Sequence, residues 1–77
     1  MNYSEKEIAI LLNNVSILRR TNNLSQKEMA KKLNIGVHTL NKIENGELPK
    51  RLGVKTLFLI EKHFNIPASM LFEEIKQ

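Results

Sequence analysis

The sequence predicts an all-α fold, a single compact domain of five helices over residues 1–77. Apolar side chains recur every three or four residues along most of the chain, which is the spacing of helices with one buried face. The alternation of apolar and polar residues typical of half-buried strands is missing. The chain has only three Phe and one Tyr, so its core must consist of Leu, Ile, Val and Met. It has no cysteine, which excludes disulfides and thiolate metal sites.

The first helix is predicted over residues 5–21. Its inward face carries Ile8, Leu11, Leu12, Val15 and Leu18. Ser4 stands where an N-cap is needed and Glu7 follows three residues later, which is the spacing of a capping box. The run Thr21–Asn23 ends the helix, because Asn tolerates turn and left-handed backbone geometry.

Residues 25–46 predict two short helices joined by a tight turn. Ser25 and Glu28 repeat the capping-box spacing and open the first helix, whose inward residues are Met29, Ala30 and Leu33. Residues 34–36, with the sequence Asn-Ile-Gly, form the turn. The second helix runs from about residue 37 to residue 45, and Gly46 stops it. Two short helices joined by a turn that contains Gly are what a helix-turn-helix requires.

The rest of the chain predicts an exposed loop and two further helices. The loop covers residues 47–53 and contains Pro49, two basic residues and a glycine. A fourth helix over residues 54–63 places Val54, Leu57, Ile60 and Phe64 inward. After a turn over residues 65–67, a short last helix begins near Pro67, which suits a first helical turn, and carries Leu71 and Phe72.

The second helix of the helix-turn-helix presents a mixed polar face. Leu40 and Ile43 fasten it to the core, Ala30 sits where the two helices cross, and Ile35 points inward from the turn. The outer face then consists of Val37, His38, Asn41 and Lys42. Hydrogen-bond donors, an acceptor and one apolar contact near a helix N-terminus suit the reading of base edges in a DNA major groove.

The positive charge is concentrated in the middle of the chain. The whole chain carries a net charge of +4. Residues 19–55 contain nine basic and three acidic residues, whereas the two ends together contain three basic and five acidic residues. The segment that holds the predicted helix-turn-helix is therefore the segment that would attract a phosphate backbone.

These residues make the chain similar to the phage Cro/repressor-type helix-turn-helix family, also called the XRE family. The matching strings are Ser25-Gln26, Glu28-Met29-Ala30, Leu33-Asn34-Ile35, Leu40 and Ile43-Glu44-Asn45-Gly46. Outside this motif the resemblance extends to Leu18-Arg19, Leu57, Ile60, Phe64–Ile66 and Leu71, and so covers roughly residues 10–73. It implies a lambda-repressor-like fold and a DNA-binding transcriptional regulator, most simply a repressor on a palindromic operator.

The resemblance also implies individual roles. Base-reading positions carry over to Val37, His38, Asn41 and Lys42, and phosphate-binding positions to Gln26, Thr39, Asn45, Lys50 and Arg51. Arg19 and Glu44 are expected to form a structural salt bridge. Three positions depart from the family pattern. Gly36 stands where Ser or Thr is usual, Val37 replaces a polar residue, and Leu59 has no evident core role.

The partner of the domain is expected to be double-stranded DNA, and two further interactions remain open. A homodimer through the C-terminal helices would give the surface needed for a palindromic site, with Leu59, Met70 and Ile75 as its apolar patch. The alternative function is an antitoxin or another protein-interaction module with the same fold, and a generic helical bundle is a third hypothesis.

An enzyme is not expected, because no nucleophile, base and orienting group occur at known spacings and His38 and His63 lie in different helices. The sequence predicts no cofactor and no metal site. It shows no targeting segment and no apolar run that would span a membrane, which favours a bacterial or phage protein of the cytoplasm, associated with the nucleoid.

Overall fold

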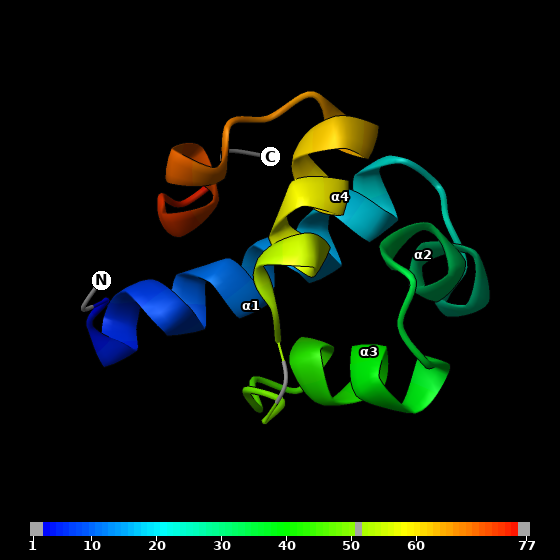
Figure 1. Ribbon diagram of the computed structural model, residues 1–77, viewed down its shortest axis with the longest axis horizontal. Helices are drawn as coiled ribbons and strands as arrows, with labels where there is room; N and C mark the ends of the chain where they lie inside the picture. Colours follow the sequence, from blue (N-terminus) through cyan, green and yellow to red (C-terminus); the bar gives the residue numbers. More distant parts are fainter. Residues whose placement is uncertain (1–2, 51, 76–77) are drawn as a thin grey trace.

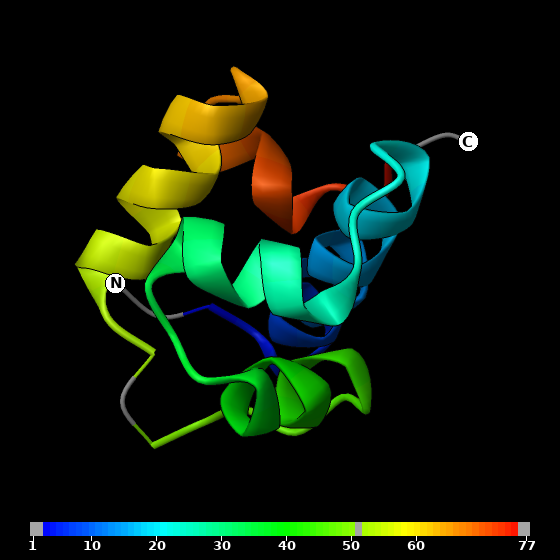
Figure 2. The same cartoon turned by 90° about the vertical axis from the view of Figure 1, so that its right-hand side faces the viewer.

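The computed structural model describes residues 3–50 and 52–75, which fold into four α-helices and one 3-10 helix with no strand among them. The helices are α1 (Glu5–Thr21), α2 (Gln26–Leu33), α3 (Val37–Glu44) and α4 (Val54–Phe64), followed by η1 (Ala68–Phe72). The all-α prediction is confirmed. Figures 1 and 2 show α3 along one edge of the molecule and η1 on a different side, next to α1 and α4. Within the described residues no helix is long and apolar enough to cross a membrane.

Both predicted capping boxes are present. The backbone N–H of Glu7 donates to Ser4 Oγ at 3.1 Å, and the backbone N–H of Ser4 donates to the Glu7 carboxylate at 3.0 Å. Ser25 and Glu28 make the same reciprocal pair at 3.0 and 2.8 Å. Each box satisfies two backbone groups that would otherwise be unpaired at a helix start. Local sequence therefore fixes where α1 and α2 begin.

The turn between α2 and α3 has the geometry that its sequence favours. Asn34 adopts the left-handed conformation with φ of 56°, and the backbone N–H of Ile35 donates to the Ala30 carbonyl at 3.0 Å. Ile35 is half-buried and packs against the core. At the far end of α3, Gly46 has φ of 83°, a conformation that L side chains rarely adopt. The short α3 is thus bounded by two backbone conformations suited to Asn and Gly.

One core joins all five elements. It contains Leu11, Leu12, Val15 and Leu18 of α1, Met29, Ala30 and Leu33 of α2, Leu40 and Ile43 of α3, Ile60 of α4, and Leu71 and Phe72 of η1. α1 packs on both α3 and η1, and α2 packs on both α3 and α4. The helix-turn-helix is therefore clamped between α1 and α4, and α3 contributes two core side chains to this arrangement.

Three expectations for the second half of the chain are corrected. Val54 does not point inward: its side chain is 83% exposed, while Thr56 is buried in its place. Leu59, which had no evident core role, is half-buried and packs against the core. The fifth helix is a 3-10 helix of five residues, because the short segment after Pro67 closes with a bond from the N–H of Met70 to the carbonyl of residue 67 at 2.9 Å.

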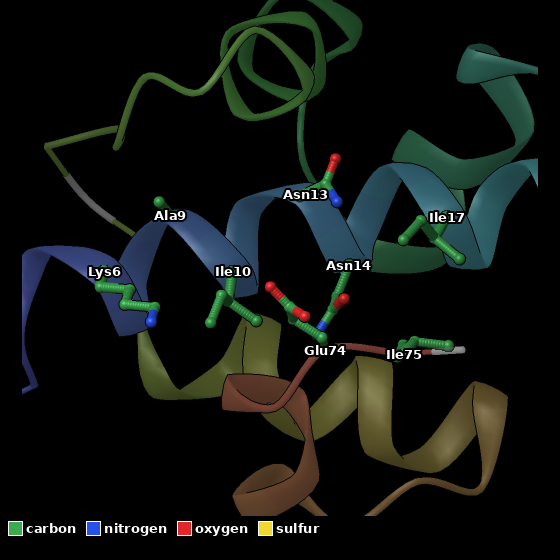
Figure 3. A pocket seen from close by; sticks show the side chains of 8 residues that line it. All are labelled: Lys6, Ala9, Ile10, Asn13, Asn14, Ile17, Glu74 and Ile75. Atoms are coloured by element: carbon green, nitrogen blue, oxygen red, sulfur yellow. The ribbon is translucent and has the colours of Figure 1, made fainter. Parts of the chain in front are cut away.

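A buried asparagine that sequence reasoning did not select anchors the C-terminal segment. Asn14 of α1 is 1% exposed, and its Nδ2 donates to the carbonyl oxygens of Leu71 at 2.8 Å and Glu73 at 2.7 Å. Figure 3 shows Asn14 directed from α1 toward the chain that carries Glu74 and Ile75. A groove lies between α1 and the C-terminal segment at this point, and none of the predicted DNA-contacting residues lines it.

Candidate nucleic-acid interface

The outer face of α3 carries the four predicted base-reading residues. Leu40 and Ile43 are 0% and 1% exposed, which fixes the rotation of this eight-residue helix about its axis. On the opposite side Val37, His38, Asn41 and Lys42 are all exposed to solvent. The Val37 side chain is 45% exposed, so its apolar surface is open to contact. The structure thus brings the four residues together on one surface, at a helix that DNA could approach.

The loop after α3 lies alongside that helix. The backbone N–H of Glu47 donates to the Lys42 carbonyl at 2.9 Å, and the N–H of Gly46 donates to the Ile43 carbonyl at 3.0 Å. These bonds fold the loop back against α3, as Figure 2 shows for the green and yellow-green segments. The hollow between them is lined by Ile35, Gly36, Thr39, Lys42, Glu47, Leu48, Pro49 and Lys50.

The hollow gathers residues predicted for two different roles. Thr39 and Lys50, expected at phosphates, line it together with Lys42, expected at a base. Asn45, another expected phosphate contact, is exposed at the C-terminal end of α3. Arg51 lies outside the described residues. Lysine side chains on the rim of a surface hollow suit the phosphates at the edge of a DNA groove.

Leu48 is a member of this surface that sequence reasoning missed. Its side chain is 52% exposed and lines the hollow between α3 and the loop. No periodicity could have found it, since it lies outside the helices. The available signal was its position, as an apolar residue in a polar loop that directly follows the helix-turn-helix.

α3 begins without a side-chain cap. Gly36 occupies the N-cap in an extended conformation with φ of −75°, and no side chain accepts a bond from the first turn of the helix. A Cβ added at Gly36 would meet nothing within 4 Å. The backbone and the space at this position would therefore accept the Ser or Thr that the family pattern favours.

The structure contains the Arg19–Glu44 ion pair, and other donors converge on the same carboxylate. Arg19 Nε lies 2.7 Å from Glu44 Oε2, and Arg19 Nη2 lies 2.9 Å from Glu44 Oε1. Gln26 Nε2 donates to Glu44 Oε1 at 3.4 Å, and Ser16 Oγ does so at 3.5 Å. Arg19 Nη1 also donates to the Leu24 carbonyl at 3.0 Å, so the network ties α1, the α1–α2 connection, α2 and the end of α3 together.

The network favours the charged forms of both Glu44 and Arg19. Partial burial alone would raise the pKa of Glu44, but the hydrogen bonds from Arg19, Gln26 and Ser16 and the charge of Arg19 outweigh it, and the pKa of Glu44 lies below its ordinary value. The hydrogen bond to Glu44 likewise raises the pKa of Arg19. The side chain of Glu44 is 9% exposed and that of Arg19 is 19% exposed, so the pair is only lightly screened by solvent.

The comparison with protein families decides between a generic helical bundle and a DNA-binding domain. The sequence model of a family described as helix-turn-helix matches residues 15–71. The chain belongs to this helix-turn-helix family, of the Cro/C1 or XRE type. Comparisons with curated proteins and with solved structures gave no match.

The match to the family model indicates the general activity of the domain, which is DNA binding. It begins within α1, contains α2, α3 and α4, and ends in η1, so it covers the core and the exposed face of α3. Membership of the family implies DNA binding, and domains of this kind are typical of regulators that are not enzymes. The resemblance predicted from the sequence is confirmed.

Proposed function

We propose that the protein is a sequence-specific transcriptional repressor that blocks a promoter by occupying a palindromic operator at the nucleoid. The observation that carries the proposal is the position of α3, which is fixed to the core by Leu40 and Ile43 while its mixed polar face is open. A rigid helix with donors, an acceptor and an apolar side chain on its free face can distinguish base pairs in a major groove.

In this proposal the two classes of contact have different roles. Val37, His38, Asn41 and Lys42 read base edges, with Val37 against a thymine methyl group. Gln26, Thr39, Asn45 and Lys50 hold phosphates and set the register of α3 on the duplex, as base-reading elements require. The chain's basic middle segment supplies the affinity that depends on salt.

Selection of bound fragments from a random DNA pool tests this function directly. The expected result is a recurring site with two symmetric halves, bound with an affinity that falls steeply as salt is raised. The variant K42A should relax the preference at one base position per half-site, at a cost of about 1–3 kcal/mol there. A pool that yields no recurring sequence, or a K42A variant with the full preference, would contradict the proposal.

A palindromic operator requires two copies of the domain, and α4 offers the surface for their contact. Val54 and Phe58 are 83% and 58% exposed, and with Tyr3, Leu57 and Phe72 they line an apolar hollow. Of the trio expected from the sequence, Leu59 packs against the core, whereas Met70, which is 52% exposed, and Ile75 line a second hollow at the C-terminal segment. Apolar side chains gathered in this way are typical of interaction sites.

The variants F58E and M70E separate the two candidate surfaces, since both place a charge on an exposed apolar position. F58E should bind a half-site duplex normally but fail to form the two-copy complex on the full operator, whereas M70E should form it. A two-copy complex of F58E would exclude the α4 surface. If operator occupancy never exceeds one copy for the unmodified protein, the exposed α4 patch instead favours the alternative of a protein-interaction module such as an antitoxin.

A further inference from the structure

Gln26 stands at the junction of two features of the structure. It is the first residue of α2 and half-buried, with part of its side chain open to solvent. Its Nε2 donates to Glu44 Oε1 at 3.4 Å, at the end of α3. The side chain expected to meet a DNA phosphate is therefore already engaged, inside the protein, with the carboxylate that also binds Arg19.

We infer that Glu44 is a positioning residue for DNA binding, which orients the Gln26 carboxamide so that its second Nε2 hydrogen is presented to a phosphate. The inference rests on the proposed function, because it needs Gln26 at the DNA backbone. Glu44 thus preorganises the phosphate contact from α3, although its own side chain touches neither a base nor a phosphate.

The chemistry of the amide explains why such a residue is needed. A glutamine carboxamide has a donor end and an acceptor end of nearly the same shape, and rotation by half a turn exchanges them. A phosphate accepts hydrogen bonds only, so the acceptor end of Gln26 would face it with repulsion. A carboxylate that accepts one Nε2 hydrogen selects the donor orientation and leaves the other hydrogen available. It also restricts the side chain before binding, so that less entropy is lost in the complex.

The positive charge of Arg19 offsets the repulsion that the Glu44 carboxylate would otherwise exert on a nearby DNA phosphate. The guanidinium reaches both oxygens of Glu44, at 2.7 and 2.9 Å, and so compensates the negative charge within one network. Arg19 is itself held by the Leu24 carbonyl at 3.0 Å. Glu44 can therefore act on Gln26 as a fixed acceptor without adding a net negative charge to the surface.

A double-mutant cycle in DNA affinity tests the inference, with E44Q, Q26A and the double variant measured on a duplex taken from the selection. In E44Q an amide nitrogen can replace the oxygen that faces Gln26, while the remaining oxygen still accepts from Arg19. We expect E44Q to weaken binding about three- to tenfold when Gln26 is present. In the Q26A background the same substitution should weaken binding less than about twofold.

The control is E74Q, which removes one negative charge from an exposed position on the C-terminal segment and should leave affinity unchanged. Thermal unfolding of all five proteins shows whether each is folded at the assay temperature. If E44Q weakens binding equally with and without Gln26, Glu44 acts on the fold alone and the inference is overturned. If the unmodified chain binds no duplex at all, it is the proposed function that fails.

A second measurement needs no variant of Glu44. In the nuclear magnetic resonance spectrum of the free protein, the Nε2 proton of Gln26 that faces Glu44 should lie downfield of its position in an unrestrained glutamine and should exchange more slowly with water than the other Nε2 proton. On addition of the duplex the outward proton should shift while the inward one changes little. Shifts and exchange rates of both Nε2 protons equal to those of an unrestrained glutamine would overturn the inference even if E44Q proved too unstable to assay.

Discussion

Replacement of Asn14 by alanine should lower the free energy of unfolding more than substitutions of exposed residues do. The side chain is 1% exposed and donates to two carbonyls, those of Leu71 at 2.8 Å and Glu73 at 2.7 Å. Loss of two neutral hydrogen bonds costs about 1–3 kcal/mol, and a carbonyl left buried without a donor adds about 1 kcal/mol or more. We expect N14A to lower the free energy of unfolding by about 2–4 kcal/mol, a large share of the stability of a small domain.

The neighbouring Asn13 provides a matched control. It is exposed on the same helix, so N13A removes the same chemical group and keeps the bonds from Asn14 to Leu71 and Glu73, and its effect should stay within about 0.5 kcal/mol. Urea unfolding followed by circular dichroism measures both variants. Hydrogen exchange should also show faster exchange for the η1 amides in N14A. Equal stability of N14A and N13A would show that Asn14 does not anchor η1 and would refute the reasoning.

Three further predictions concern the helix-turn-helix. The pKa of Glu44 is lowered in the folded protein, so its contribution to stability is fully present above its ordinary pKa of 4.5 and is lost as pH falls through the folded value. In urea unfolding, the stability difference between E44Q and the unmodified protein should therefore shrink in acid. A difference that does not change with pH would contradict the ion pair. Substitution G36S should raise the free energy of unfolding by about 0.5–1 kcal/mol in the same assay, because the position has room for a side chain and its extended backbone suits any residue. A lower free energy of unfolding would contradict the expected space at this position. Variant K50A should reduce the slope of log affinity against log salt by about one while leaving the selected sequence unchanged, and a changed sequence preference would make Lys50 a reader.

The sequence predicted those parts of the fold that depend on near neighbours. The capping boxes of α1 and α2 each join residues three positions apart, and the left-handed turn at Asn34 follows from the side chain at that position. The rotation of α3 followed from Leu40 and Ile43, because two inward residues three positions apart define a helical face. The exposed face of α3 could therefore be predicted as the residues that do not point inward.

Features that depend on distant parts of the chain were not accessible in the same way. Asn14 lies three residues after Leu11 and four before Leu18, which places it beside the inward face, but the carbonyls that it binds are 57 and 59 residues away and the local sequence does not identify them. Val54 fitted an inward pattern on α4 but lies at the first turn, beyond the reach of the core, and Thr56 is buried instead. The exposed apolar patch of α4 could not be foreseen, since apolar spacing does not say which members lack a partner.

The face of α3 that we propose to read DNA lies opposite the side chains that hold this short helix in place. An isolated helix of eight residues is unstable in water, so α3 persists because Leu40 and Ile43 are buried and Glu44 is bound by Arg19. The outward residues contribute little to that burial, and substitutions among them should change stability by no more than about 0.5 kcal/mol. If the proposed function holds, base preference can therefore vary while the fold stays intact. Gln26 is the exception, because its hydrogen bond to Glu44 couples the proposed phosphate contact to the ion pair that holds α3 in place.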